Sequence, residues 1–254
     1  MNIRKALPVQ NNCIVCDWRS PGFFCQLPED VLGKFGTLKI THAYPKGTTL
    51  FVEGQEANGI YVLCEGKIKL TTYSEDGRSM ILRVAEPGEA LGLSASVAGH
   101  DYECTAQAIT DCQVNFLRTS DLLRLFAEHS EAAFNAIRDL SVVYHKAHLK
   151  VCSLGLSSSV SDKLARLLLD WFEHSGELKT GSWIPLDFTH EEIAEMIGTS
   201  RETVTRLLKI FRTQQLITLE KSKLFIPDRR RLEAVIGSNR VYESERCDDG
   251  HISK

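Results

Sequence analysis

Residues 189–211 read THEEIAEMIGTSRETVTRLLKIF, and this stretch decides how the rest of the chain is interpreted. Thr189 followed three residues later by Glu192 is the pattern of a capping box, which begins a helix. Gly198 follows, where a sharp turn needs a residue that is free to adopt a positive φ. The segment 199–202, Thr-Ser-Arg-Glu, repeats the capping pattern. We therefore predict two short helices joined by a glycine turn.

The second of these helices has one apolar and one polar face. Its apolar stripe consists of Val204, Leu207, Leu208 and Phe211. Helix, turn and helix at this spacing is the helix-turn-helix plan, whose second helix enters the major groove of DNA. Arginine can pair with guanine through two hydrogen bonds, and glutamate can accept one from cytosine. The predicted DNA-contacting residues of this helix lie off the stripe: Ser200, Arg201, Glu202, Thr203, Arg206 and Lys209.

Charge is unevenly distributed along the C-terminal third of the chain. The whole chain has a net charge of −3. Residues 199–231 contain nine Lys or Arg against three Asp or Glu, whereas residues 158–198 contain three against eight. The basic part includes Lys221 and Lys223, in a segment that predicts a two-stranded wing able to touch phosphates. Positive charge is thus concentrated where a DNA-facing surface is expected, although a solvated basic face would give the same count.

Residues 29–130 predict an antiparallel β-roll. Short apolar runs alternate with glycine turns from residue 35 to residue 118. One example is the hairpin signal Ser74-Glu75-Asp76-Gly77 between two apolar runs. Strands at about ten-residue spacing are typical of a small roll or barrel.

The period becomes helical from Leu122 onward, and residues 131–157 predict one long helix. Apolar residues recur in it at alternating spacings of three and four, as in a coiled-coil seam. A symmetric partner chain is the simplest surface for such a narrow seam, and packing on the chain's own roll is the alternative. The predicted dimer interface comprises Ile137, Leu140, Tyr144, Ala147, Val151 and Leu154.

Residues 35–235 resemble the CRP/FNR family of bacterial regulators. The resemblance rests on Pro45-Lys46-Gly47, Gly54, residues 61–66, Gly77, Gly88 and above all residues 198–208. It implies an α+β fold: an N-terminal antiparallel β-roll of the cyclic-nucleotide-binding type, a long dimerisation helix and a winged helix-turn-helix over residues 158–237. It further implies that Arg201 and Arg206 read guanines, that Glu202 reads a cytosine in TGTGA-like half-sites of a palindromic operator, and that RNA polymerase is a partner.

The nucleotide site of that family is incomplete in this chain. Its cyclic-nucleotide binders carry Gly-Glu-Leu in the phosphate cassette and an arginine about ten residues later. Here the corresponding run is Gly92-Leu93-Ser94, and the arginine position falls near Tyr102. Without the carboxylate and the cation, the roll has little means of holding a cyclic phosphate. We do not expect cyclic AMP to bind.

Residues 1–28 form a predicted irregular arm that carries Cys13, Cys16 and Cys25. The arm resembles the cluster-binding segment of oxygen-sensing family members, which implies a [4Fe–4S] cluster. Two departures are the eight residues between Cys16 and Cys25 and the lack of an obvious fourth ligand. The candidates for that ligand are Cys112, Cys104 and Cys64, each of which also fits a buried structural role. A zinc site, thiol-based redox sensing and a purely structural arm remain alternatives.

Other classes of function have little support in the sequence. We find no nucleophile–base motif and no phosphate-binding glycine loop, so we expect no enzyme. No apolar run reaches the ~20 residues of a membrane span, and we expect a cytoplasmic protein with a polar tail over residues 238–254. The rival from another class is a small-molecule-binding or redox module whose helix-turn-helix contacts protein instead of DNA.

Overall fold

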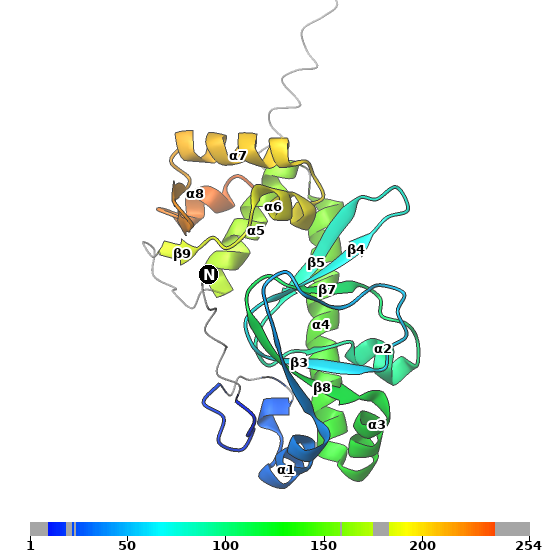
Figure 1. Cartoon of the computed structure of the whole chain (residues 1–254). Helices are drawn as coiled ribbons and strands as arrows, with labels where there is room; N and C mark the ends of the chain where they lie inside the picture. Colours follow the sequence, from blue (N-terminus) through cyan, green and yellow to red (C-terminus); the bar gives the residue numbers. More distant parts are fainter. Residues whose placement is uncertain (1–9, 19–21, 23, 158, 175–182, 237–254) are drawn as a thin grey trace, which may run out of the picture. The chain divides into compact units, whose positions relative to one another are not determined.

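The computed structural model describes residues 10–18, 22, 24–157, 159–174 and 183–236. The chain divides into two compact units, Met1–Ala147 and His148–Lys254, and the border falls inside one long helix (Figure 1). The predicted tail, residues 238–254, lies outside the described residues. No helix in the described ranges is long and apolar enough to cross a membrane.

The first unit contains the predicted roll, built from two four-stranded antiparallel sheets. One sheet has the strand order β1-β8-β3-β6 and the other β2-β7-β4-β5. The strands are β1 (Ile40–Tyr44), β2 (Thr49–Phe51), β3 (Gly59–Glu65), β4 (Ile68–Tyr73), β5 (Ser79–Ala85), β6 (Ala90–Leu91), β7 (Thr105–Ala108) and β8 (Cys112–Arg118). This arrangement confirms the predicted fold class.

Turn chemistry explains two features of the roll. The predicted hairpin joins β4 to β5, and Gly77 supplies its positive φ of 80°. Gly66, between β3 and β4, has a φ of 95° and lies against the strand that starts at Cys112. A Cβ at Gly66 would come within 2.4 Å of the Asp111 carbonyl oxygen, so only glycine fits there.

Helices at one end of the roll enclose the first core. They are η1 (Phe24–Gln26), α1 (Glu29–Leu38), α3 (Thr119–Glu128) and the start of α4 (Ser130–Leu156), while α2 (Leu93–Ala98) follows β6. Phe24 stacks on Phe35 with ring centroids 4.5 Å apart. Ala132 and Ala136 bury the inner side of α4 against this core, and Leu140 packs on it partly buried. The first turns of α4 are therefore held by the roll itself.

The second unit contains the predicted pair of short helices and a small sheet. Its elements are α5 (Val160–His174), β9 (Trp183–Pro185), α6 (His190–Ile197), α7 (Arg201–Thr213), β10 (Thr218–Glu220), β11 (Lys223–Phe225) and α8 (Arg229–Glu233). The sheet has the order β10-β11-β9, so the predicted two-stranded wing gains a third strand. Strand β9 is three residues long and ends in proline, which suits an edge and leaves little sequence signal.

The caps of α6 and α7 differ from each other. Thr189 and Glu192 form the predicted capping box, and Gly198 ends α6 with a φ of 66°. The second predicted box is wrong: the N-cap of α7 is Ser200, whose hydroxyl accepts from the Thr203 backbone N–H. Helix α7 therefore begins one residue later than the pattern predicts, because serine at 200 caps as readily as threonine at 199.

Candidate nucleic-acid interface and cysteine cluster

Helix α7 presents a polar face that begins at its first turn. Arg201 and Glu202 are its first two residues, and both are exposed. Arg206 and Lys209 are exposed one and two turns later, whereas Thr203 is half-buried. The opposite face is buried through Val204, Leu207, Leu208 and Phe211. The side chains of α7 predicted to contact DNA thus lie along one polar face, exposed apart from the half-buried Thr203.

Glu202 carries a stabilised negative charge at this end. Its pKa is lowered by its own backbone N–H, by the Ser200 hydroxyl and by the neighbouring Arg201. The amino end of a helix favours a carboxylate in any case, because unpaired backbone N–H groups point outward there. Glu202 is therefore an acceptor at neutral pH, as pairing with a cytosine amino group requires.

A contact between α6 and α7 was not predicted from the sequence. His190 at the start of α6 lies with its Nδ1 2.8 Å from the Thr205 hydroxyl on α7. That hydroxyl also donates to the Arg201 carbonyl oxygen at 2.9 Å. Thr205 is thus occupied in joining the two helices, while Arg201, Glu202 and Arg206 are exposed.

The two wing lysines lie at the β10–β11 turn. Lys221 has a positive φ of 51° in the turn itself, and Lys223 begins β11. Both side chains are exposed. Exposed ammonium groups on a hairpin suit contacts to phosphate oxygens, which position a protein on DNA without reading sequence.

Helix α4 carries a row of exposed apolar side chains. Phe134, Ile137, Tyr144 and Val151 are 55%, 58%, 75% and 69% exposed. Of the predicted interface residues, Ile137, Tyr144, Ala147 and Val151 are exposed, while Leu154 is half-buried. Leu140 is turned toward the roll core. The outward row therefore runs through Ile137, Tyr144 and Val151, spaced by sevens, without Leu140.

Aromatic side chains fill the interior of the roll next to α2. Tyr102 is buried, stacks on Phe51 at a centroid distance of 4.0 Å and donates its hydroxyl to the Gly59 carbonyl oxygen at 2.6 Å. Tyr61 packs against both rings. A Cβ at Gly92 would lie 2.6 Å from the Tyr102 ring, so the ring packs directly against the backbone just before α2.

Two cations of the first unit, Arg83 and Lys146, share the carboxylate of Glu89. Arg83 pairs with Glu89, and both side chains are only about one-fifth exposed (20% and 21%). Lys146 on α4 lies 3.8 Å from the same carboxylate. These charges are compensated within the unit, which leaves them less able to attract a phosphate.

The cysteine arm meets the roll at Cys64. The amide nitrogen of Asn115 lies 3.0 Å from the Cys64 sulfur and 4.0 Å from the Cys13 sulfur. The Asn115 oxygen accepts from the Lys39 ammonium at 3.0 Å and from the Thr41 hydroxyl at 2.7 Å. One buried amide thus joins two thiols to a cation. The strand pairing of β3 with β8 creates this contact between residues far apart in sequence.

The charged groups that shift the pKa of Cys64 include all three arm cysteines. Burial is the main cause that raises the pKa of Cys64 to about 12; Cys13, Cys25 and Cys16 contribute to this rise, and Lys39 opposes it. Within the part of the chain that is described, no three His, Cys, Asp or Glu side chains are arranged as a metal site. The four thiols are therefore neighbours without forming a closed ligand set.

The other two candidate ligands lie elsewhere. Cys112 is fully buried and donates to the carbonyl oxygens of Lys67 and Thr110. Burial raises the pKa of Cys104 to about 11, and its charged neighbours are Arg83, Glu103 and Glu53. Neither has an arm cysteine among the groups that shift its pKa.

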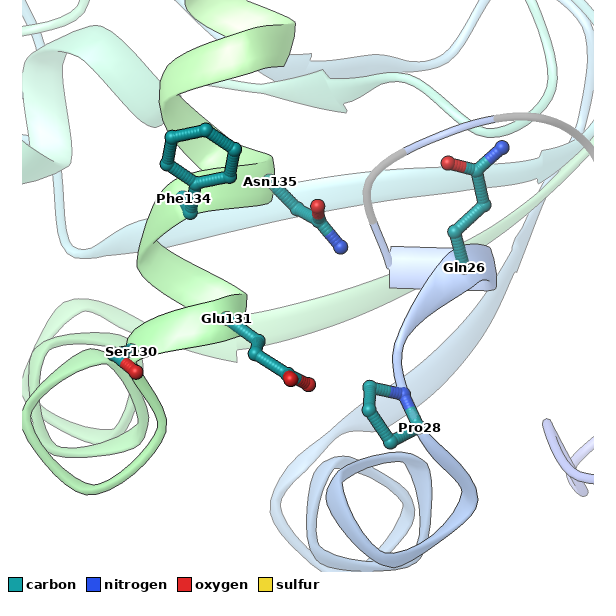
Figure 2. Close-up of a pocket in the computed structure, with 6 residues that line it drawn as sticks. All are labelled: Gln26, Pro28, Ser130, Glu131, Phe134 and Asn135. Atoms are coloured by element: carbon teal, nitrogen blue, oxygen red, sulfur yellow. The ribbon is translucent and has the colours of Figure 1, made fainter.

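Figure 2 shows an open groove between η1 and the start of α4. Its lining residues are Gln26, Pro28, Ser130, Glu131, Phe134 and Asn135. The set contains one carboxylate and two amides but no cation, thiol or histidine, so it offers no positive charge for a phosphate and no soft ligand for an iron–sulfur cluster. Phe134 connects this groove to the exposed row of α4.

The roll, the three-stranded sheet and the charged α7 face define a winged helix-turn-helix DNA-binding regulator. Residues 41–129 match the cyclic nucleotide-binding domain family, and residues 162–235 match the Crp-like helix-turn-helix domain. The chain belongs to the CRP/FNR family of bacterial transcription regulators.

Relatives in this family are transcription regulators, not enzymes. A CRP-like cAMP-activated global transcriptional regulator of Mycobacterium tuberculosis is 27% identical over 190 residues, covering 74% of this chain and 84% of the relative. The transcriptional regulator LdrP of Thermus thermophilus is 28% identical over 200 residues, covering 77% and 96%. The structure of FixK2 from Bradyrhizobium japonicum has the same fold, with a TM-score of 0.69, 21% identity and coverage of 79% and 98%.

Proposed function

We propose that the chain acts as a homodimer that binds a palindromic operator with TGTGA-like half-sites. The observation that carries this proposal is the exposed set of Arg201, Glu202 and Arg206 at the amino end of α7. Two arginines and one ionised glutamate match guanine and cytosine edges in the major groove. Such a regulator works in the cytoplasm with RNA polymerase as its partner, as the resemblance implies.

The exposed row on α4 supports the dimer. Three large apolar side chains, Ile137, Tyr144 and Val151, are more than half exposed on one helix and recur every seven residues. Burying apolar surface stabilises by about 25 cal/mol per Å², and a second copy offers an identical row. A twofold axis along α4 would repeat the α7 surface, which is why the DNA site should be a palindrome.

Selection of binding sites from random duplexes tests the DNA-reading proposal. We expect enrichment of a palindrome with guanines and a cytosine in each half-site. Binding should weaken linearly on a logarithmic salt scale, because phosphate contacts release counterions. Enrichment of unrelated or unpaired sequences would contradict the base assignment. A salt-independent interaction with protein and none with duplex would instead favour the rival module.

We further propose that the arm responds to redox conditions through a sulfur-ligated centre on Cys13, Cys16, Cys25 and Cys64. Four thiols suit an iron–sulfur cluster or zinc. Cys64 is the favoured fourth ligand because it shares the Asn115 amide with Cys13. Lys39 supplies positive charge that opposes the rise in the pKa of Cys64 caused by burial, although burial dominates until a metal is bound. A cluster would add sensitivity to oxygen; the closed ligand set would then form only on binding.

Purification without oxygen, followed by iron, sulfide and zinc analysis and an absorption spectrum, tests this centre. Cys64→Ser should lower the bound metal to the level of a Cys13→Ser variant. Cys104→Ser is the matched control and should retain it, since Cys104 lies away from the arm thiols. Equal metal content in Cys64→Ser and the unmodified protein would exclude Cys64 as a ligand. Metal-free protein in every case would leave thiol oxidation or a structural arm.

Cyclic AMP is not the proposed signal. The filled position of Tyr102 and the pairing of Arg83 with Glu89 support this part of the proposal. A cyclic phosphate would have to displace a buried ring or break an ion pair before gaining a cation of its own.

A further inference from the structure

Lys150, near the end of α4, makes a contact that the proposed DNA reading does not use. Its ammonium donates a hydrogen bond of 2.6 Å to the carbonyl oxygen of Met196, in the last turn of α6. Both residues belong to the second unit. Met196 is buried and Lys150 is half-buried, so the contact is shielded from water.

The acceptor is one of the carbonyl groups that a helix end leaves without an intrahelical partner. The backbone N–H groups of Gly198 and Thr199 both donate to the Ala194 carbonyl oxygen. The Met196 carbonyl oxygen is instead taken by Lys150. A cation near the carboxyl end of a helix is also favoured by the helix dipole. The contact therefore completes the end of α6 at the point where the chain turns into α7.

Holding an ammonium group there has an energetic cost. Burial lowers the pKa of Lys150, and the negative charge of Asp170 on α5 opposes this shift only in part. An exposed lysine on α4 would avoid that desolvation, as Lys146 one turn earlier does, being 48% exposed. The buried position places the ammonium where it can form the hydrogen bond to the Met196 carbonyl oxygen, and this bond offsets part of the desolvation cost.

We propose that Lys150 is a positioning residue that fixes α6, and through it the recognition helix α7, on the last turns of α4. Helices α6 and α7 are already joined by the contact between His190 and Thr205 and by the buried stripe of α7. Anchoring α6 at its carboxyl end thus anchors the pair. This proposal rests on the proposed dimer, in which α4 carries the interface.

The consequence concerns half-site spacing and not base reading. The two recognition helices of a dimer must be about one helical turn of DNA apart, roughly 34–36 Å. That separation is set by how each helix pair is held on its own α4. Loosening the anchor lets each pair pivot, so palindromes with a longer or shorter spacer become less strongly rejected. Arg201, Glu202 and Arg206 still meet their bases within each half-site.

The test uses the full-length protein and duplexes that carry the selected palindrome or the same half-sites with one base pair added to or removed from the spacer. For Lys150→Met, which keeps the length and packing of the side chain but loses the donor, we expect discrimination against the altered spacers to fall roughly tenfold, the lower range of typical coupling between sites. Affinity for a duplex with a single half-site should be unchanged. Lys150→Arg should restore most of the discrimination.

Lys146→Met is the matched control, because it removes an ammonium from the same helix without touching α6. It should keep the spacer discrimination of the unmodified protein. Unchanged discrimination in Lys150→Met, or an equal loss in Lys146→Met, would overturn the proposal.

If the unmodified protein binds no palindrome, the dimer proposal fails on its own. Backbone hydrogen exchange then tests the anchor without DNA. Lys150→Met should exchange faster than the unmodified protein at residues 197–199 but not in α5. Equal exchange rates of the two proteins at residues 197–199 would overturn the proposed anchor. Lys150→Leu, which also lacks a donor, serves where Lys150→Met does not fold.

Discussion

The position of Arg201 depends on the residue at which α7 begins. Ser200 caps α7, so Arg201 is its first residue and its guanidinium projects from the exposed amino end. The residues proposed to read bases could be chosen from the sequence, since the apolar stripe leaves only one polar face. The cap does not follow, because serine and threonine are both favoured N-cap residues and the pattern Thr199-x-x-Glu202 pointed to the wrong one.

Arg201→Ala should relax base preference at one position of each half-site, with a loss of about 1–3 kcal/mol in binding free energy. The guanidinium would no longer pair with a guanine, and the other positions would keep their preference. Binding-site selection with the variant measures this. Lys223→Ala is the control: it should weaken all sequences alike and lower the salt slope by about 1. Unchanged preference in Arg201→Ala would remove that residue from the reading set.

Ser200→Ala should lower the free energy of unfolding of the second unit by about 1 kcal/mol, whereas Ser200→Gly should cost only a few tenths. The alanine variant leaves the Thr203 backbone N–H without its acceptor. Thermal unfolding followed by circular dichroism measures both. Thr199→Ala is the control and should change little, since Thr199 is not the cap. A larger loss of unfolding free energy in Thr199→Ala than in Ser200→Ala would contradict the assignment of Ser200 as the N-cap.

At the scale of elements, strongly patterned segments were predictable and short ones were not. The helix pair, the β4–β5 hairpin and the long α4 follow from periodicity and glycine placement. Strand β9 and helix α8 have three and five residues, too few to show a period. The sequence predicted which residues belong to the apolar seam of α4, but not which of them face solvent. Which members face inward depends on the roll core, which takes Leu140.

Introducing charge into the exposed row of α4 should separate the proposed dimer. In the double variant Ile137→Glu and Tyr144→Glu, like charges would face each other across the twofold axis in a surface that otherwise buries apolar groups. We expect a monomer in sedimentation equilibrium and a loss of palindrome binding. Leu123→Glu on α3 is the control, because Leu123 is 44% exposed but lies off the row. A dimer that survives the double substitution would place the interface elsewhere.

At the scale of the molecule, the position of Cys64 beside the arm was beyond sequence reasoning. Cys64 and Asn115 are brought together by the pairing of β3 with β8, and no local pattern encodes which strand lies beside which. The roll interior is a similar case. The departure of residues 92–94 from the family's phosphate cassette is visible in the sequence, but the stacking of Tyr102 on Phe51 required the fold.

Cyclic AMP at 1 mM should leave the thermal unfolding midpoint of the full-length protein unchanged. A ligand present at 100 times its Kd would add about 2.7 kcal/mol of stability and raise the midpoint by several degrees. Scanning calorimetry with and without nucleotide measures the shift. The Mycobacterium tuberculosis relative, described as cAMP-activated, provides a positive control. A saturable upward shift in this chain would show that Tyr102 can be displaced.

The stacked rings inside the roll also have a mechanical consequence. Close-packed interiors have low compressibility and pass strain on to their neighbours. Phe51, Tyr61, Tyr102 and Phe116 form one continuous contact from β2 through β3 to β8. Asn115, beside the arm thiols, is the next residue along β8. We therefore expect a displacement of Asn115 at the arm to pass along β8 to these rings, because close packing leaves little free volume to absorb it.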